Sequence, residues 1–187
     1  MPKVHRYEYA MPDHHMRCPI MGQGGNHFNG RILSLGVEIE RPTPDQYFMQ
    51  MARLARERST CLRRKVGAVM VKDRHILTTG YNGAPKGLRH CAEVGCVREQ
   101  NAIPSGVKTE LCRGVHAEQN TIIQASVFGV SISGATLYVT NYPCVACAKM
   151  LINAEIAEIV YDDEYEDPLS KEILEESGIV VRRYHLE

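Results

Sequence analysis

From residue 116 to residue 184, helical and strand-like segments alternate, and this alternation limits the possible folds more than any other feature of the chain. The expected helices span residues 116–128, 144–153 and 170–177, and the expected strands span residues 135–140, 156–161 and 179–184. Strands separated by single helices favour parallel pairing, because each helix returns the chain to the same end of the sheet. The sequence therefore predicts a sheet that is parallel in this half.

A helix and a hairpin are expected before this region. The helix begins at Thr43, a suitable N-cap, with Pro44 at the first helical position and Gln46 completing a capping box. It runs to about residue 59, and its apolar face consists of Tyr47, Phe48, Met51, Leu54 and Ala55. Strands at 66–71 and 75–79, separated by turn residues 72–74, predict an antiparallel hairpin. The predicted fold class is α/β, a three-layer α/β/α arrangement around a mixed, mostly five-stranded sheet.

The first part of the chain lacks this regularity. Residues 1–41 mix His, Pro, Gly and Met without periodicity, and residues 22–26 (GQGGN) are typical of a flexible turn. We therefore expect an N-terminal extension at 1–41 and one folded domain at 42–187. His14 and His15 in the extension could bind a metal, but surface residues are the better interpretation.

Charge and hydropathy favour a small substrate. The chain has 22 basic and 22 acidic residues, so it lacks the overall positive field that holds long nucleic acids. No stretch is apolar enough for a membrane helix, and residues 1–15 lack the apolar run of a secretory signal. Seven cysteines, an odd number, favour thiolate chemistry over disulfides. We expect a cytoplasmic protein without long nucleic acid or membrane as a partner.

The strongest motif is His116-Ala-Glu118, followed by Pro143-Cys144-Val-Ala-Cys147. One imidazole and two thiolates supply three ligands to a tetrahedral Zn²⁺ and leave the fourth position for water, as catalytic zinc requires. The cysteines open a helix, whose unpaired amides favour the thiolate form. A structural or redox CxxC pair is the alternative. The combination with HxE is the signature of zinc nucleobase deaminases, so we predict a catalytic zinc.

Glu118 is the predicted catalytic residue. It lies two positions from His116, which aims it away from the ligand position but keeps it close to the metal. We expect it to take a proton from the zinc-activated water and pass it to N3 of cytosine, so that hydroxide attacks C4. It then protonates the departing amine.

A second group of metal-ligand residues lies in a long segment without periodicity that ends near Gly114. Such a segment is usually functional or held by something other than a core. A second, structural zinc could order it, with Cys91, Cys96 and Cys112 of the segment and Cys61, just before the first strand, as ligands and His90 as a substitute. The alternative is that these are reduced cysteines without a metal.

At this point the chain resembles the deoxycytidylate deaminase family within the cytidine deaminase superfamily. The resemblance extends from Ser59 to about Tyr161 and is carried by STCLRRKVGAVMVKD, GYNGAPKG, HCAEVGC, CRGVHAEQN and GATLYVTNYPCVACAKMLINA. HxE with PCxxC identifies only the superfamily, whereas GYNGAPKG with HAEQN on a short chain points to the deoxycytidylate branch. The first forty or so residues fall outside the resemblance.

The resemblance implies a cytidine-deaminase-like fold, a homo-oligomer that is often a hexamer, and hydrolysis of dCMP to dUMP and ammonia, which supplies dUMP for thymidylate synthesis. It also implies activation by dCTP and inhibition by dTTP in many members. Asn82 is implied to lie near the nucleotide, and Cys61 and Cys91 to take part in a second zinc site. A turn residue with positive φ is the alternative for Asn82.

For the phosphate of the substrate, Arg58, Lys65 and Tyr165 are candidates, because phosphate binds guanidinium, ammonium or hydroxyl donors. Other functions stay open. They are a deaminase of adenosine in transfer RNA, a deaminase of a free base or nucleoside, or a non-catalytic module that binds zinc or nucleotides. Transfer RNA would require a basic surface, which the zero net charge does not favour.

Overall fold

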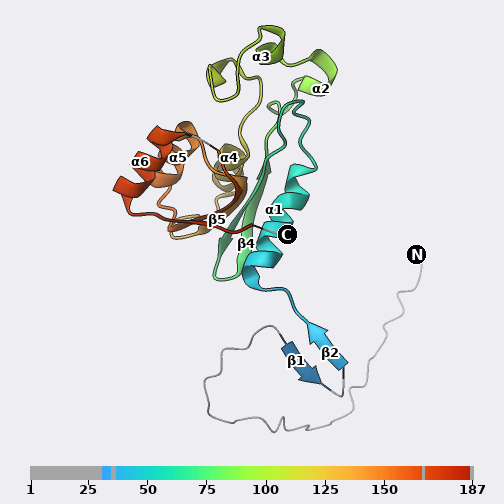
Figure 1. The fold of residues 1–187 in the computed structure, drawn as a ribbon, viewed down its shortest axis with the longest axis vertical. Coiled ribbons are helices and arrows are strands. Elements are labelled where there is room, and N and C mark those ends of the chain that lie inside the picture. The colour runs from blue at the N-terminus through green and yellow to red at the C-terminus, as the bar shows by residue number, and fades with distance from the viewer. Residues whose placement is uncertain (1–30, 35–36, 166, 186–187) are drawn as a thin grey trace, which may run out of the picture.

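The computed structural model describes residues 31–34, 37–165 and 167–185 (Figure 1). The strands are β1 (Arg31–Ser34), β2 (Val37–Glu40), β3 (Gly67–Lys72), β4 (His75–Tyr81), β5 (Thr136–Asn141), β6 (Glu158–Asp163) and β7 (Val180–Arg183). The helices are α1 (Pro44–Arg56), α2 (Cys91–Val94), α3 (Val97–Gln100), the 3₁₀ helix η1 (Thr109–Leu111), α4 (Ala117–Phe128), α5 (Val145–Asn153) and α6 (Pro168–Ser177). No helix among the described residues is long and apolar enough to span a membrane.

Five strands form one mixed sheet in the order β4-β3-β5-β6-β7. β3 pairs antiparallel with both β4 and β5, whereas β5, β6 and β7 are parallel to one another. The predicted mixed five-stranded sheet is therefore confirmed. Because β4 runs in the same direction as β5, the carboxyl ends of both strands lie at the same edge of the sheet.

Helices cover both faces of the sheet, which confirms the predicted three-layer fold (Figure 1). Alternate residues of β3 point to opposite sides. Val69 and Val71 pack with α1, whereas Ala68 and Met70 pack with α4, α5 and α6. The core is therefore divided into two apolar layers, one on each side of the strands.

The buried face of α1 differs from the predicted one. Thr43 forms the expected capping box with Gln46, but the side chains that reach the core are Phe48, Met49 and Ala52, while Leu54 is 65% exposed. Tyr47 is also exposed. Asp45, bound to Tyr138 and Arg182, fixes how the helix is rotated against the sheet. The predicted apolar face was therefore right for Phe48 and Met51, which pack in the core, and wrong for Tyr47 and Leu54. A periodicity argument cannot detect this long-range anchor.

Two other regions gain structure that the sequence did not suggest. Residues 31–40, inside the expected extension, contain the β1–β2 hairpin, which Figure 1 places away from the five-stranded sheet. The segment between β4 and α4 contains the short helices α2, α3 and η1. The expected turn at 22–26 and the histidines at 14 and 15 lie outside the described residues.

The edge strand β4 is held by polar side chains of α4. The amide of Thr79 donates to Gln124 Oε1 at 2.9 Å, and Asn120 Nδ2 donates to the carbonyl of Tyr81 at 2.7 Å. The backbones also approach closely, because a Cβ added to Gly80 would lie 2.2 Å from the carbonyl oxygen of Ala117. The start of α4 is therefore fixed to the end of β4 near the carboxyl edge.

Candidate active site

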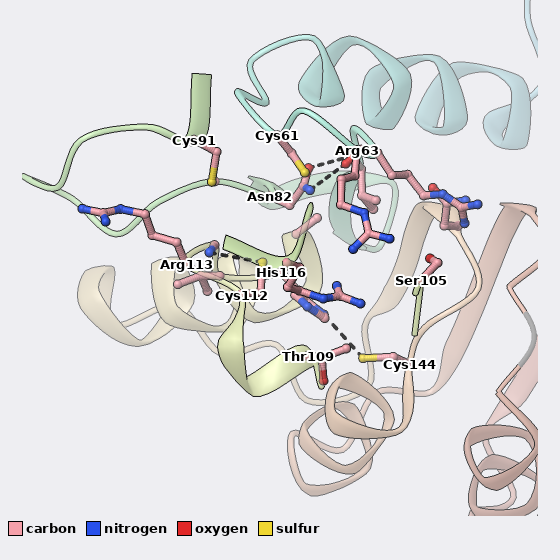
Figure 2. Close-up of a pocket in the computed structure, with 18 of the residues that line it drawn as sticks. Cys61, Arg63, Asn82, Cys91, Ser105, Thr109, Cys112, Arg113, His116 and Cys144 are labelled. Atoms are coloured by element: carbon pink, nitrogen blue, oxygen red, sulfur yellow. Dashed lines mark hydrogen bonds between the residues drawn. The ribbon is translucent and has the colours of Figure 1, made fainter. Parts of the chain in front are cut away.

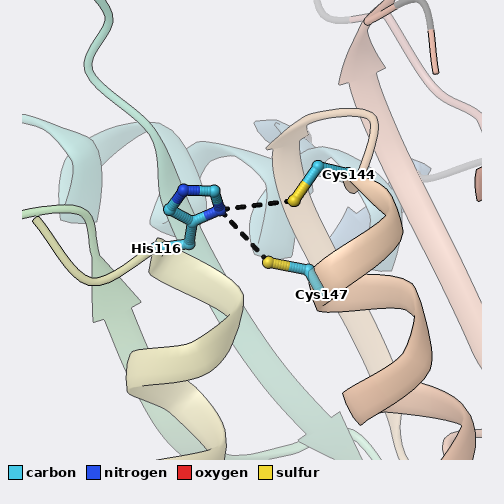
Figure 3. A group of neighbouring side chains, drawn as sticks. All are labelled: His116, Cys144 and Cys147. Atoms are coloured by element: carbon cyan, nitrogen blue, oxygen red, sulfur yellow. Dashed lines mark hydrogen bonds between the residues drawn. The ribbon is translucent and has the colours of Figure 1, made fainter. Parts of the chain in front are cut away.

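The structure brings His116, Cys144 and Cys147 together at the carboxyl edge of the sheet (Figure 3). Nδ1 of His116 lies 3.4 Å from Sγ of Cys144 and 3.3 Å from Sγ of Cys147. His116 is the N-cap of α4 and Cys144 is the N-cap of α5, so two helix starts present the three side chains. The predicted convergence at this edge therefore has a simple cause in the topology.

This donor set fits a zinc ion. With tetrahedral zinc, typical Zn–N and Zn–S bonds would separate the nitrogen and sulfur atoms by roughly 3.5 Å. The observed spacings lie close to that value, and all three ligand atoms lie within 4.8 Å of one another. Three ligands leave one coordination position for a solvent molecule, as in catalytic zinc sites.

A hydrogen bond joins Cys144 and Cys147, with one thiol proton between the two sulfur atoms. The thiol of Cys147 donates to Cys144, and this hydrogen bond, assisted by His116, lowers the pKa of Cys144 to about 4 against the opposing effect of burial. The same bond and burial raise the pKa of Cys147 well above its ordinary range. The thiolate of Cys144 raises the pKa of His116. A zinc ion would displace the shared proton, because its sulfur ligands are thiolates.

Asp167 ties the cysteine turn to the next helix. Its carboxylate accepts from the amide of Val145 at 2.8 Å and from the amide of Ser170 at 3.1 Å, so one side chain caps both α5 and α6. Ser170 also donates to the carbonyl of Pro143 at 2.8 Å. Asp167 and Ser170 together therefore hold the turn on both sides of Cys144.

Glu118 is the second residue of α4, and only 5% of its surface is exposed. Burial raises the pKa of its carboxyl to about 7, while the nearby His116 charge and other contacts oppose that rise. It lines the same pocket as His116 and Cys144. The carboxyl group therefore stands beside the three ligand side chains, where it can accept and release protons near neutral pH.

The pocket around these residues is rich in arginine (Figure 2). Among the described residues that line it, the charged side chains other than histidine and cysteine are Glu118 and four arginines, namely Arg63, Arg64, Arg98 and Arg113. The net charge of the chain is zero, so this concentration of positive charge is local. Such a pocket favours an anionic ligand.

Asn82 lines the pocket from the end of β4, and most of its amide is already bonded. Its Oδ1 accepts from Ser59 Oγ at 2.7 Å and from the amide of Val66 at 2.8 Å, and its Nδ2 donates to the carbonyl of Arg64 at 2.8 Å. Its φ is not positive, which removes the alternative of a left-handed turn residue. One N–H of Nδ2 is left to reach a ligand.

The three predicted phosphate residues lie in different places. Tyr165 lines the pocket, with the guanidinium of Arg64 6.0 Å from its ring centre. Lys65 instead pairs with Glu57 at 3.3 Å, and Arg58 lies 6.0 Å from the ring of Tyr81 outside the pocket. The structure therefore does not bring Arg58 or Lys65 to the candidate metal site, because each has a partner elsewhere.

The four loop cysteines, Cys61, Cys91, Cys96 and Cys112, all line the same pocket. In Figure 2, Cys61 and Cys91 lie on the far side of the pocket from Cys144. Burial raises the pKa of Cys91, and the charges of Cys112, Cys61 and Cys96 raise it further. Their sulfur atoms do not reach the mutual 4.8 Å spacing of the His116 group, and His90 Nδ1 faces Thr60 Oγ1 at 3.0 Å.

A second group of close ligand atoms exists among the described residues, formed by Asp162, Asp163 and His185. Asp162 is 1% exposed and already pairs with Arg53 at 2.6 Å and with His185 at 2.9 Å. Its charge is therefore balanced, and we assign no metal to this group.

Some pocket residues were missed from the sequence. Arg63 and Arg64 belong to the basic run at 56–65, in which we selected Arg58 and Lys65 instead. Arg98, Arg113 and Asp167 carry no local pattern, and only the folding of the long segment and of α6 brings them to the site. A sequence argument would have needed the tertiary contacts to find them.

The fold and this group of His, Cys and Glu side chains define a zinc-dependent deaminase. The family model for the cytidine and deoxycytidylate deaminase zinc-binding region matches residues 42–162, more than half of the chain. The chain belongs to the cytidine and deoxycytidylate deaminase family, in its deoxycytidylate branch.

Two relatives and one solved structure support this membership. The chain is 41% identical over 131 residues to the deoxycytidylate deaminase of Mycobacterium phage D29, covering 67% of this chain and 99% of that protein. It is 38% identical over 145 residues to the deoxycytidylate deaminase of Schizosaccharomyces pombe, covering 77% of this chain but only 45% of the longer yeast protein. The crystal structure of dCMP deaminase from cyanophage S-TIM5 with dCMP and dUMP matches with a TM-score of 0.66 at 31% identity, covering 77% and 98% of the two chains. The predicted resemblance is therefore confirmed.

Proposed function

We propose that the enzyme hydrolyses dCMP to dUMP and ammonia. The observation that carries this proposal is the pocket, which joins a zinc-type ligand group and a buried carboxyl to four arginines. The ligand group suits deamination of a base, and the arginines suit a nucleotide phosphate. Phage and yeast relatives that carry the name deoxycytidylate deaminase agree with this substrate. The dUMP formed would be available for thymidylate synthesis.

In the proposed mechanism, His116, Cys144 and Cys147 would hold the zinc ion, which when bound makes hydroxide available at neutral pH. Glu118 receives the proton that the attacking water gives up and delivers it to N3 of the cytosine ring, so that C4 becomes electrophilic. When the C–N bond at C4 breaks, the same carboxyl passes the second proton of the water to the amine, which leaves as ammonia. N3 keeps its proton, and the product is the uracil ring.

The test is a panel of nucleotides assayed by ammonia release. We expect rapid loss of dCMP and little turnover of cytidine or deoxycytidine, because the nucleosides lack the charge that the arginines would bind. Comparable rates on dCMP and deoxycytidine would contradict the monophosphate assignment. Turnover of adenosine in a transfer RNA without turnover of dCMP would favour the rival deaminase. Adding dCTP and dTTP to the same assay tests the proposed activation and inhibition.

A second, structural zinc in the loop region is also part of the proposal. All four candidate ligands, Cys61, Cys91, Cys96 and Cys112, line one pocket, and three of them act on the pKa of Cys91, which supports a shared site. Elemental analysis should give two zinc atoms per chain, and Cys91→Ser should reduce the count to one. A count of one in the unmodified protein would remove this site.

We further propose that residues 42–187 form the deaminase domain, with 1–41 as an extension, and that the enzyme is a homo-oligomer, as the family resemblance implies. The family match begins at residue 42. In support of self-association, α4 exposes Ile123, Val127 and Phe128, with Val127 and Phe128 more than 70% exposed. Light scattering after gel filtration measures the mass, and a monomer at micromolar concentration would contradict the oligomer.

A further inference from the structure

Arg98 in α3 has an unusual set of partners. Its Nη2 donates to the carbonyl of Pro104 and to the carbonyl of Val107, both at 2.8 Å. Its Nε is buried and has no hydrogen-bond partner. An unpaired donor on a buried charged group costs free energy. We therefore expect a ligand atom to accept this hydrogen bond.

The position of Arg98 is close to the candidate reaction centre. It lines the pocket together with His116, Glu118 and Tyr165. It is therefore near enough to meet a nucleotide whose base lies beside Glu118.

Several contacts orient the part of the pocket wall around Arg98. The guanidinium of Arg63 donates to the carbonyl of Ile103 at 3.1 Å, next to the two carbonyls that Arg98 holds. A Cβ added to Gly106 would lie 2.8 Å from the hydroxyl of Tyr165, so the loop at 103–107 lies directly against that ring. The φ of Gly106 is +79°, which other residues rarely adopt. The two carbonyl bonds thus fix the orientation of the guanidinium before a ligand binds.

We propose that Arg98 is the residue that makes this site select a phosphorylated nucleotide over a nucleoside, with its unused Nε–H donating to a phosphate oxygen. This inference rests on the proposed function and identifies the residue that binds the substrate phosphate. Because Nε is buried in the free protein, Arg98 and the loop at 103–107 that holds it have to move together by a small amount for the oxygen to reach this donor. Arg64, by contrast, is exposed to solvent, and its guanidinium lies 6.0 Å from the ring centre of Tyr165.

The test compares dCMP and deoxycytidine as substrates of the zinc-loaded full chain and of two variants. Arg98→Gln removes the charge, and Arg98→Lys keeps the charge but removes the Nε–H group and the planar geometry. A hydrogen bond to a charged group corresponds to a factor of roughly 10 to 100. We expect kcat/KM for dCMP to fall by that factor in Arg98→Gln, mainly through KM, while kcat/KM for deoxycytidine changes less than about threefold. Arg98→Lys should lie between the two.

Arg89→Gln is the matched control, because Arg89 belongs to the same long segment but is exposed and does not line the pocket. Zinc content, measured for each variant, reports whether the site is intact. Equal losses on both substrates would overturn the proposal, since they would indicate a structural role alone. An unchanged preference for dCMP would overturn it as well while leaving the proposed function intact. If the unmodified enzyme does not deaminate dCMP, the proposed function itself fails.

Discussion

Arg182 in the last strand holds Asp45 in the first helix through two parallel hydrogen bonds, from Nη1 and Nη2 to the two carboxylate oxygens, each 2.8 Å long. The hydroxyl of Tyr138 donates to the same carboxylate at 2.8 Å, and Glu158 accepts from Nε of Arg182 at 2.7 Å. The two bonds between Arg182 and Asp45 join residues that are 137 positions apart in the chain. They connect α1 to β7 across two strands of the sheet.

Asp45→Asn should destabilise the protein by about 2 kcal/mol at pH 7, between the typical values of exposed and buried ion pairs. The hydrogen bonds from Arg182 lower the pKa of Asp45 below its ordinary value of 3.8. The stabilisation is therefore present above pH 4 and is lost as the pH falls through the lowered pKa. Urea unfolding at several pH values should show the gap between unmodified protein and variant closing below pH 4. Glu176→Gln, an exposed change on α6, is the control, and a gap that persists at low pH would contradict this origin.

Glu118→Gln should keep the metal and the fold but lose turnover by a factor of about 100 to 10,000, the typical share of general acid–base catalysis. The amide has nearly the same shape, but it cannot carry the proton. Ammonia release measures the rate, and elemental analysis measures the zinc. If the variant kept full activity with zinc bound, Glu118 would not be the proton shuttle.

Asp167→Ala should weaken zinc binding by roughly 10 to 100 fold, as is typical for residues that support metal ligands. The change leaves the amides of Val145 and Ser170 without their acceptor and loosens the turn that carries Cys144. Competition with a chromophoric chelator measures the affinity. Glu172→Ala on the exposed side of α6 is the control, and equal affinities for both variants would rule out this role.

Gly80→Ala should destabilise the protein by about 1–3 kcal/mol, the usual cost of overpacking, and should also weaken zinc binding. The added methyl group would meet the carbonyl of Ala117 at 2.2 Å, so the start of α4 has to move away from β4. His116 and Glu118 move with it. Thermal unfolding and chelator competition report the two effects, and a loss of stability with unchanged zinc affinity would show that the shift spares the site.

Much of the fold could be predicted, because the signals for its helices, strands and turns come from residues that are close in sequence. The capping box at Thr43, the hairpin turn at 72–74 and the alternation after residue 116 each depend on residues close in sequence. The rotation of α1 could not be predicted, because contacts with Asp45 from Tyr138 and Arg182 determine it. Such partners are found only once the sheet is assembled.

The candidate site divides in the same way. His116, Glu118, Cys144 and Cys147 fall in two short motifs, so their spacing was enough to place them together. The phosphate side was harder, because a charged side chain has a long reach and several neighbours in the basic run look equivalent. Pairing with Glu57 removes Lys65 from the pocket, and nothing local indicates this.

The side chains of α4 that bond to the backbone of β4 limit how copies of this protein can associate at this edge of the sheet. An uncovered outer strand can template the addition of a strand from another molecule, which leads to aggregation. Here Gln124 and Asn120 already occupy the Thr79 amide and the Tyr81 carbonyl of that strand. A neighbouring chain would have to displace both side chains before it could extend the sheet at these positions. Copies of the protein that associate on this side would therefore do so through side-chain contacts and not through strand addition.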